Sequence, residues 1–284
     1  MRAVILAGGG GTRINNPEKC LMPVWGVPIL FRVVGALQWA GFRELVVATT
    51  ARHSGVAWAA GLWGLEVAYT QGMGYERDFK EVVDRYAPAL VVSCDLADLT
   101  PRHVAPLLKN AVMATAVSGG RYVGLSWAPK LGEAWVDVEV PPLLNINTWQ
   151  DLKRAEEAAP LAYPLVVQTE GLLPHEETEG ELRLEGWVAP IVVDVWTCTV
   201  LDGHHRLRAL KEAGLPAPVL PVDYRRIDVN LNKLLVLSRA AAGSAMPPRS
   251  TWHTYKNRHV SEIPTAAAPI DFLKSTAPLR CRPS

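Results

Sequence analysis

A run of four glycines, Gly8–Gly11, comes directly after the short apolar segment Ala3–Leu6, and Thr12, Arg13 and Lys19 follow it. The apolar segment is typical of a buried strand. Glycines lack the Cβ atoms that would keep a phosphate away from the backbone N–H groups, and the two cationic side chains supply the charge that phosphates need. The pattern predicts a strand that opens into a phosphate-binding loop, and it favours an enzyme that handles nucleoside triphosphates.

Two common kinds of glycine-rich loop do not fit this sequence. The phosphate loop of P-type NTPases ends in Gly-Lys-Ser/Thr, whereas Gly11 is followed by Thr12 and Arg13. A dinucleotide fingerprint needs a third glycine where the chain has Arg13. The loop of sugar-nucleotide, molybdopterin-guanine and cobinamide nucleotidyltransferases is similar to Gly8-Gly9-x-Gly11-Thr12-Arg13 followed by Glu18-Lys19-x-Leu21-Met22-Pro23. A tight turn that binds no ligand is the alternative.

Residues 1–159 alternate between short β-rich runs and helical patterns, which indicates an α/β fold with a mostly parallel sheet. We expect strands at Ala3–Leu6, Glu44–Thr49, Glu66–Thr70, Ala89–Ser93 and roughly Val112–Val117. We expect helices at Ile29–Ala40, Tyr75–Tyr86 and Pro101–Lys109, and a last helix to Ala159 with Thr148 as its N-cap. This region is predicted to be a Rossmann-like nucleotidyltransferase domain.

Three further motifs in this region resemble those of the archaeal-type guanylyltransferases that act on adenosylcobinamide phosphate. They are Gly74-Tyr75-Glu76-x-Asp78, Val91-Val92-Ser93-Cys94-Asp95-Leu96-x-Asp98-Leu99 and Leu144-Asn145-Ile146-Asn147-Thr148-x-x-Asp151-Leu152. The resemblance implies that GTP and Mg²⁺ bind here, with Asp95 and Asn147 on the metal and Lys19 catalytic. It implies a nucleotide-binding set of Leu6, Gly8, Gly9, Gly10, Gly11, Thr12, Arg13 and Lys19. For Asn147 a turn-stabilising role is the alternative.

A domain boundary is expected at Pro160 and Pro164, because these prolines bracket a stretch without helical or strand periodicity, which suits a linker. Residues 165–284 are predicted to be a smaller α+β domain with a C-terminal extension. We expect strands at Leu165–Gln168, Ile191–Val195, Thr199–Leu201 and Val219–Val222, and a helix over His204–Ala213. From Ser238 onward we expect a docking segment or a partly mobile tail, with one helical turn near Asp271–Leu273.

Residues Asp202-Gly203-His204-His205-Arg206 end a strand and open a helix, an arrangement that suits an anion. Together with Pro174-His175-Glu176 they resemble the free serine kinases of the ParB/sulfiredoxin-like fold. The resemblance implies an amino-acid hydroxyl kinase in which Glu176 is the general base and Asp202 orients the hydroxyl or holds the metal. His204, His205 and Arg206 would contact the transferring phosphate. The alternative is that the two histidines cap the helix and pack under the sheet.

A third group of phosphate-compatible side chains, interleaved with aromatic residues, lies between Met246 and Lys256. Its members are Arg249, Ser250, Thr251, His253 and Lys256. We interpret it as a clamp for the kinase nucleotide, ATP or ADP, with a solvated basic loop as the alternative. Because an aminopropanol phosphate arm descends from phosphorylated threonine, the fusion favours L-threonine over L-serine as the kinase substrate.

The charge balance, Lys+Arg 29 against Asp+Glu 28, lacks the basic excess of proteins that bind nucleic acid. A partition-like nucleic-acid module and a scaffold that senses nucleotide without turnover stay as alternatives. We expect small-molecule substrates, no membrane span and a cytoplasmic location; the oligomeric state is left open. Cys20, Cys94, Cys198 and Cys281 show no C-x-x-C pair, so we expect reduced thiols in the core.

Overall fold

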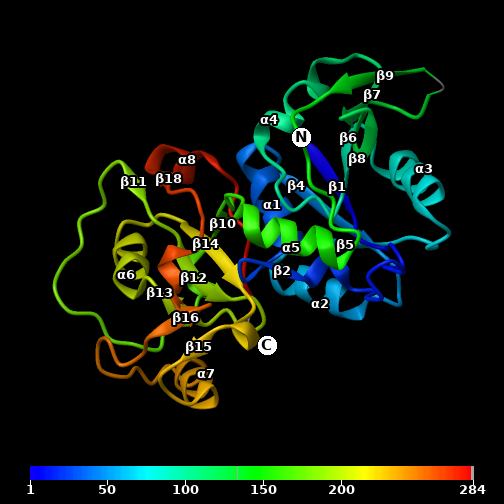
Figure 1. Cartoon of the computed structure of the whole chain (residues 1–284). Coiled ribbons are helices and arrows are strands. Elements are labelled where there is room, and N and C mark those ends of the chain that lie inside the picture. The colour runs from blue at the N-terminus through cyan, green and yellow to red at the C-terminus, as the bar shows by residue number, and fades with distance from the viewer. Residues whose placement is uncertain (133, 283–284) are drawn as a thin grey trace.

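The computed structural model describes residues 1–132 and 134–282. A seven-stranded sheet has the order β5-β4-β1-β6-β8-β7-β9 (Figure 1). Its strands are β1 (Arg2–Leu6), β4 (Glu44–Thr49), β5 (Glu66–Tyr69), β6 (Ala89–Ser93), β7 (Met113–Ser118), β8 (Arg121–Ala128) and β9 (Trp135–Glu139). Strands β5, β4, β1 and β6 are mutually parallel, whereas β8 runs antiparallel to β6 and β7. The prediction of an α/β fold with a mostly parallel central sheet is confirmed.

Five helices belong to this region: α1 (Ile29–Trp39), α2 (Ser54–Leu62), α3 (Tyr75–Tyr86), α4 (Pro101–Val104) and α5 (Trp149–Ala158). Thr148 caps α5 as predicted, because its side chain accepts a hydrogen bond from the backbone of Asp151. The predicted helix over Pro101–Lys109 is wrong. It ends at Val104 and a separate 3₁₀ turn follows over Leu107–Lys109, because Pro106 has no N–H to donate. A short hairpin of β2 (Pro23–Val24) and β3 (Val27–Pro28) precedes α1.

A second sheet has the order β10-β14-β12-β13. Its strands are β10 (Leu165–Val167), β12 (Ile191–Asp194), β13 (Val200–Asp202) and β14 (Ala217–Val222), and α6 (His204–Glu212) follows β13. Further elements are α7 (Lys233–Ala241), α8 (Ile270–Ser275), the pair β11 (Trp187–Val188) and β18 (Ala268–Pro269), and the sheet of β15 (Asp228–Val229), β16 (His253–Tyr255) and β17 (Arg258–His259). The C-terminal segment packs against the second sheet, since Leu279 forms a β-bridge with Val167 of β10.

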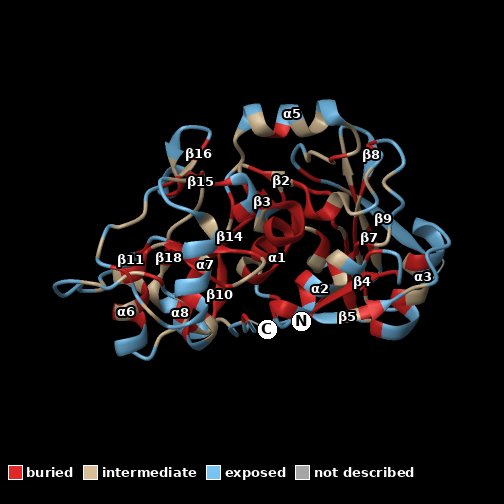
Figure 2. Ribbon diagram, turned by 90° about the horizontal axis from the view of Figure 1, so that it is seen from below, coloured by how far each residue is buried: buried red, intermediate tan, exposed pale blue. Residues whose placement is uncertain are grey.

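Helix α1 connects the two sheets. Ten of its eleven residues are buried, and Figure 2 shows it in the middle of the molecule. Gln38 donates to the carbonyls of Val166 and Ala277, and the Trp39 indole donates to that of Pro164 at 3.0 Å. One apolar cluster contains buried residues from both predicted domains. Because Trp39 of α1 is hydrogen-bonded to Pro164, the segment between Pro160 and Pro164 lies against α1. The division of the chain into two domains at this segment stays a prediction.

The four cysteines form two disulfides, Cys20–Cys94 and Cys198–Cys281. The prediction of reduced thiols is therefore wrong. The partners are 74 and 83 residues apart, so no local spacing reveals them; the fold brings the end of β6 next to the turn after Lys19. Among the described residues there is no helix long and apolar enough to cross a membrane.

Candidate nucleotide-binding site

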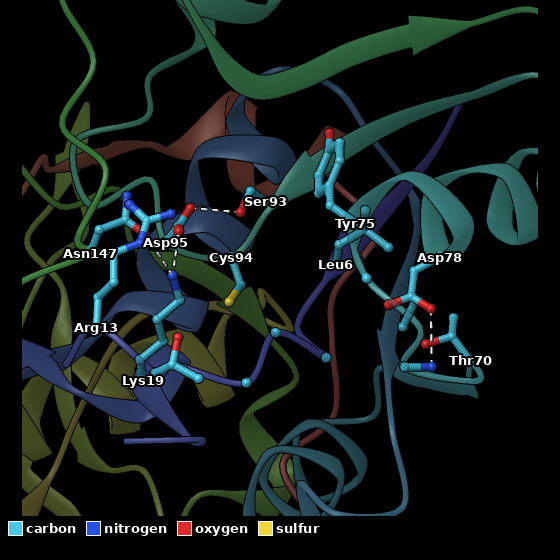
Figure 3. Close-up of a pocket in the computed structure, with 18 residues that line it drawn as sticks. Leu6, Arg13, Lys19, Thr70, Tyr75, Asp78, Ser93, Cys94, Asp95 and Asn147 are labelled. Atoms are coloured by element: carbon cyan, nitrogen blue, oxygen red, sulfur yellow. Dashed lines mark hydrogen bonds and ion pairs between the residues drawn. The ribbon is translucent and has the colours of Figure 1, made fainter. Parts of the chain in front are cut away.

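A cavity of about 360 Å³ lies at the carboxyl ends of the parallel strands (Figure 3). Strand β1 leads into the glycine loop, β6 leads into Asp95, and Asn147 comes from the segment before α5. All the N-terminal site residues predicted from the sequence line this cavity: Leu6, Gly8, Gly9, Gly10, Gly11, Thr12, Arg13, Lys19, Asp95 and Asn147. The structure thus brings together residues that are up to 141 positions apart, from Leu6 to Asn147.

The glycine loop turns sharply at Gly11, which has a φ of +57°. A Cβ atom there would overlap the backbone carbonyl of Asn16, so only glycine fits. Within the described part of the chain, no acceptor takes a hydrogen bond from the backbone N–H of residues 8–13. Unpaired main-chain N–H groups that converge on one cavity form a binding site for an anion.

Lys19 and Asp95 form an ion pair at the opposite side of the cavity from Tyr75 and Asp78 (Figure 3). The Lys19 Nζ lies 2.6 Å from Asp95 Oδ2 and 3.2 Å from Asn147 Oδ1. The other Asp95 oxygen accepts a hydrogen bond from Ser93 Oγ at 2.6 Å. The side chains of Lys19 and Asp95 are only 13% and 7% exposed, so their charges are screened weakly by water.

The donor set fits Mg²⁺ bound partly by the substrate. Mg²⁺ is usually held by one or two carboxylates, water and substrate phosphates, and Asp95 and Asn147 offer one carboxylate and one amide oxygen. In the described residues there is no group of three His, Cys, Asp or Glu side chains that could hold a metal alone. The ammonium of Lys19 lies between the two oxygens, where it neutralises Asp95.

The rim contains residues that the motifs included without a role. Asp78 accepts a hydrogen bond from Gly72 N at 3.1 Å and so holds the loop before α3. Asp98 does not line the cavity, and its carboxylate accepts the Leu144 N–H at 2.8 Å. Thr70 and Ser93 also line the cavity. Ser93 belongs to a motif quoted above, in which it was given no role, and no sequence signal marks Thr70 beyond its place at a predicted strand end.

A separate cavity of about 360 Å³ lies where β13 meets α6. The predicted residues that line it are Glu176, Asp202, His204, His205, Arg206, Arg249 and Thr251. Trp252 and His259 also line the cavity, with their rings tilted against one another and their centres 4.3 Å apart. The aromatic residues noted from the sequence between Met246 and Lys256 include Trp252, whereas His259 was not identified. Arg206 is paired with Asp202 at 2.6 Å, so these two side chains neutralise one another.

Glu176 is hydrogen-bonded to the segment Arg249–Thr251, two residues of which, Arg249 and Thr251, line this cavity. Its Oε1 accepts from the N–H of Thr251 at 2.7 Å and from the Thr251 hydroxyl at 2.5 Å, and its Oε2 accepts from Arg249 N at 3.2 Å. A carboxylate has about four acceptor positions, and these bonds use three of them. One acceptor position, on Oε2, remains.

Three buried histidines, His175, His204 and His253, lie close together next to Glu176. The ring of His175 packs edge-on against His204 and His253, with centre distances of 4.6 and 5.7 Å. Burial, reinforced by the neighbouring His175, lowers the pKa of both His204 and His253 to about 3, and burial also lowers the pKa of His175. All three rings are therefore neutral at ordinary pH.

The structure does not place Ser250, His253 or Lys256 in this cavity. The Ser250 hydroxyl donates to the carbonyl of Pro247. His253 is buried, with 1% of its surface exposed, and its ring is hydrogen-bonded to the Tyr224 hydroxyl. Lys256 points to α5, where its ammonium lies 2.5 Å from Glu156 Oε2. Of the predicted clamp, only Arg249 and Thr251 line the cavity.

A mostly parallel sheet whose first strand opens into a glycine loop, with Lys19 paired to Asp95 after the neighbouring strand β6, is the arrangement expected of a nucleotidyltransferase. A family description, the MobA-like NTP transferase domain, matches residues 3–171. The chain belongs to this family.

Three curated relatives match parts of the chain. The adenosylcobinamide-phosphate guanylyltransferase of Methanocaldococcus jannaschii is 32% identical over 111 residues, which are 37% of this chain and 56% of that protein. The glucose-1-phosphate thymidylyltransferase of Mycolicibacterium smegmatis is 41% identical over 54 residues, 18% of this chain and 19% of that protein. The bifunctional IPC transferase and DIPP synthase of Thermococcus kodakarensis is 43% identical over 53 residues, 19% of this chain and 12% of that protein. The matches thus span less than two thirds of each relative.

Solved structures also align with the chain. The Mycobacterium tuberculosis protein Rv0371c has 19% identity and a TM-score of 0.43, and covers 55% of this chain and 97% of that one. Its homologue from Mycobacterium sp. strain JC1 has 20% identity and a TM-score of 0.45, and covers 55% of this chain and 95% of that one.

Proposed function

We propose that the N-terminal region transfers GMP from GTP to the phosphate of adenosylcobinamide phosphate and releases pyrophosphate. The observation that carries the proposal is the row of unpartnered backbone N–H groups over residues 8–13, which faces the Lys19–Asp95 pair. This arrangement suits a triphosphate. The choice of guanine and of the acceptor is supported by the similarity to the adenosylcobinamide-phosphate guanylyltransferase of Methanocaldococcus jannaschii, which matches the longest stretch of the three relatives, 111 residues.

In the proposed mechanism the loop N–H groups hold the phosphate oxygens of GTP, and Arg13 and Lys19 neutralise them. An oxygen of the acceptor phosphate attacks the α-phosphorus in line, and the bond to the bridging oxygen of pyrophosphate breaks. Charge accumulates on the phosphorus oxygens in the transition state, so fixed positive groups lower the barrier. Mg²⁺ would neutralise the triphosphate from a place on Asp95 and Asn147, and Lys19 would then move from Asp95 to the phosphates.

The test compares two carboxylates on one loop. We expect Asp95→Asn to lower the rate of GMP transfer on the order of 100-fold or more, with the melting temperature nearly unchanged. Asp98→Asn is the matched control, because its amide oxygen can still accept the Leu144 N–H; we expect its rate to stay within about twofold. The readout is pyrophosphate release with GTP and acceptor, and the same rate in both variants would contradict the proposal.

A second candidate activity belongs to residues 165–284: phosphorylation of free L-threonine, with ATP or ADP as donor. The observation that favours it is the cavity in which Glu176, His205 and Arg249 meet the Arg206–Asp202 pair. The free acceptor position of Glu176 would take the hydroxyl proton, and the cationic groups would hold the transferring phosphoryl group. Fused in one chain, the two activities would both serve the nucleotide loop of cobalamin.

Its test offers L-threonine and L-serine with each donor and measures the phosphorylated amino acid by mass. We expect a preference for threonine, and a loss on the order of 100-fold in Glu176→Gln. Glu179→Gln, an exposed glutamate outside the cavity, is the control and keeps the wild-type rate. A strong preference for serine would refute the pathway assignment, and no product with either amino acid would refute the kinase.

A further inference from the structure

A third cavity, of about 460 Å³, lies beside the nucleotide cavity and shares Tyr75 with it. It is formed by the start of α3 and by the antiparallel part of the large sheet. Its lining is Tyr75, Glu76, Phe79, Met113, Thr115, Tyr122, Gly124, Ser126 and Trp135. We call it the aromatic basin. None of the functional residues predicted above, and none of the proposed catalytic groups, lies in it.

The basin offers mainly aromatic and apolar surface. Tyr75, Tyr122 and Trp135 are 46%, 62% and 55% exposed, which is unusual for side chains of this size on one face. The basin contains one charged residue, Glu76, and no cation. An anionic group such as a second phosphate would not be held here.

Several polar groups of the basin are already partnered within the protein. The hydroxyls of Thr115 and Ser126 are hydrogen-bonded to each other at 3.1 Å, and the Tyr122 hydroxyl donates to Asp137 at 3.2 Å. A sugar ring needs several free donors and acceptors to be recognised, because each unpaired hydroxyl costs free energy on burial. The lining therefore suits a ring system with apolar faces better than a sugar.

The basin adjoins the place where the proposed reaction occurs. Gly124 on β8 lies so close to Ser93 that a Cβ atom on Gly124 would be 2.9 Å from the Ser93 Cβ and 3.9 Å from the Tyr75 ring. Ser93 in turn donates its hydrogen bond to Asp95. A molecule whose phosphate lies near Asp95 can thus place the rest of its structure beyond Tyr75, in the basin.

We propose that the aromatic basin binds the body of the phosphate acceptor, and that this body is a broad ring system with apolar faces, not a sugar. The inference rests on the proposed nucleotidyl transfer and adds the acceptor's binding surface. Its energy comes from burial of apolar area and from stacking on Tyr122 and Trp135. Binding of GTP does not depend on it.

The experiment removes the two most exposed rings in Tyr122→Ala and Trp135→Ala; Trp187→Ala, 66% exposed on β11 and outside the basin, is the control. With GTP and adenosylcobinamide phosphate, we expect the KM of the acceptor to rise about tenfold in each basin variant, about the loss of one stacked ring. The KM of GTP stays within about twofold. Titration calorimetry with phosphate-free cobinamide should show the same loss of affinity in both variants, with no effect of the control.

Each outcome decides between the two proposals. An unchanged acceptor KM and unchanged cobinamide affinity in both basin variants would overturn the inference. So would efficient transfer to glucose 1-phosphate that the basin variants do not affect, although nucleotidyl transfer itself would then stand. Binding of cobinamide that requires the basin, without GMP transfer to any acceptor, would support the basin as a binding site and refute the proposed function.

Discussion

His204 is one of the few titratable groups whose environment makes a direct prediction about pH. Its pKa is lowered from 6.5 to about 3, first by burial and then by the neighbouring His175. In the unfolded chain the imidazole takes up a proton below its ordinary pKa of about 6.5, whereas the folded protein keeps it neutral. The unfolded state then binds more protons, so the free energy of unfolding decreases as the pH falls from 6.5 towards 3.

We expect each such histidine to contribute a slope of about 1.4 kcal/mol per pH unit well below pH 6.5. In His204→Gln the slope between pH 4.5 and 6 should be smaller than in the wild type by about that amount, since one titrating group is removed. Urea unfolding at several pH values measures it. Because carboxylates contribute equally to both proteins, the difference isolates His204, and identical slopes would contradict a neutral buried ring.

At the same scale, the sequence identified Asp95 because it follows the end of strand β6. Lys19 lies in the 3₁₀ turn Lys19–Leu21 and Asn147 lies in the loop before α5, so the motifs that resemble known nucleotidyltransferases, and not a strand end, identified these two residues. Lys256 shows where sequence reasoning fails. It belongs to the turn between β16 and β17, and that turn directs it to Glu156 on α5. No local pattern gives the direction of such a turn.

Among the elements, Gly35 in α1 lies in close contact with the segment between Pro160 and Pro164. A Cβ atom at this position would overlap the carbonyl oxygen of Tyr163, whose neighbour Pro164 accepts the Trp39 indole hydrogen bond. We expect Gly35→Ala to destabilise the protein by about 2 kcal/mol or more, because backbone has to move in a packed core. Gly61→Ala in α2 is the matched control. No atom lies within 4 Å of its Cβ position, so alanine should stabilise the helix by up to about 1 kcal/mol.

Thermal unfolding of the two variants gives opposite signs if this account is right, and a lowered melting temperature in both would count against it.

Elements with a clear local signal were predictable: β4, β6 and α3 have the bounds that the sequence indicated. Helix α3 has apolar residues at helical spacing, and β4 and β6 are short, continuous apolar runs typical of buried strands. The sequence did not reveal α2, because Ser54–Leu62 is small and apolar on most sides and lacks a polar face. Strand β8 was missed although Gly119-Gly120 joins it to β7 in a tight hairpin, which is a local turn signal. Strand β9 was missed because it pairs in parallel with β7, a partner that is not its neighbour along the chain.

On the scale of the whole molecule, the disulfides change what is expected of the chain. Cys20–Cys94 joins the residue after Lys19 to the residue before Asp95, and Cys198–Cys281 fastens the tail to the second sheet. Disulfides persist in oxidising compartments and in proteins of some hyperthermophiles, and they are rare in most cytosolic proteins. The cytoplasmic location therefore stays a prediction that these bonds do not support.

Closing loops of 74 and 83 residues restricts the unfolded chain, and each bond should stabilise the fold by about 4 kcal/mol on the chain-entropy account. Cys198→Ser with Cys281→Ser should lower the melting temperature strongly and leave GMP transfer intact, because neither cysteine lines the nucleotide cavity. Cys20→Ser with Cys94→Ser should reduce transfer as well, since these residues adjoin Lys19 and Asp95. Thiol titration of the denatured wild type should find no free thiol before reduction and four afterwards; four without reduction would show that the pairs do not form.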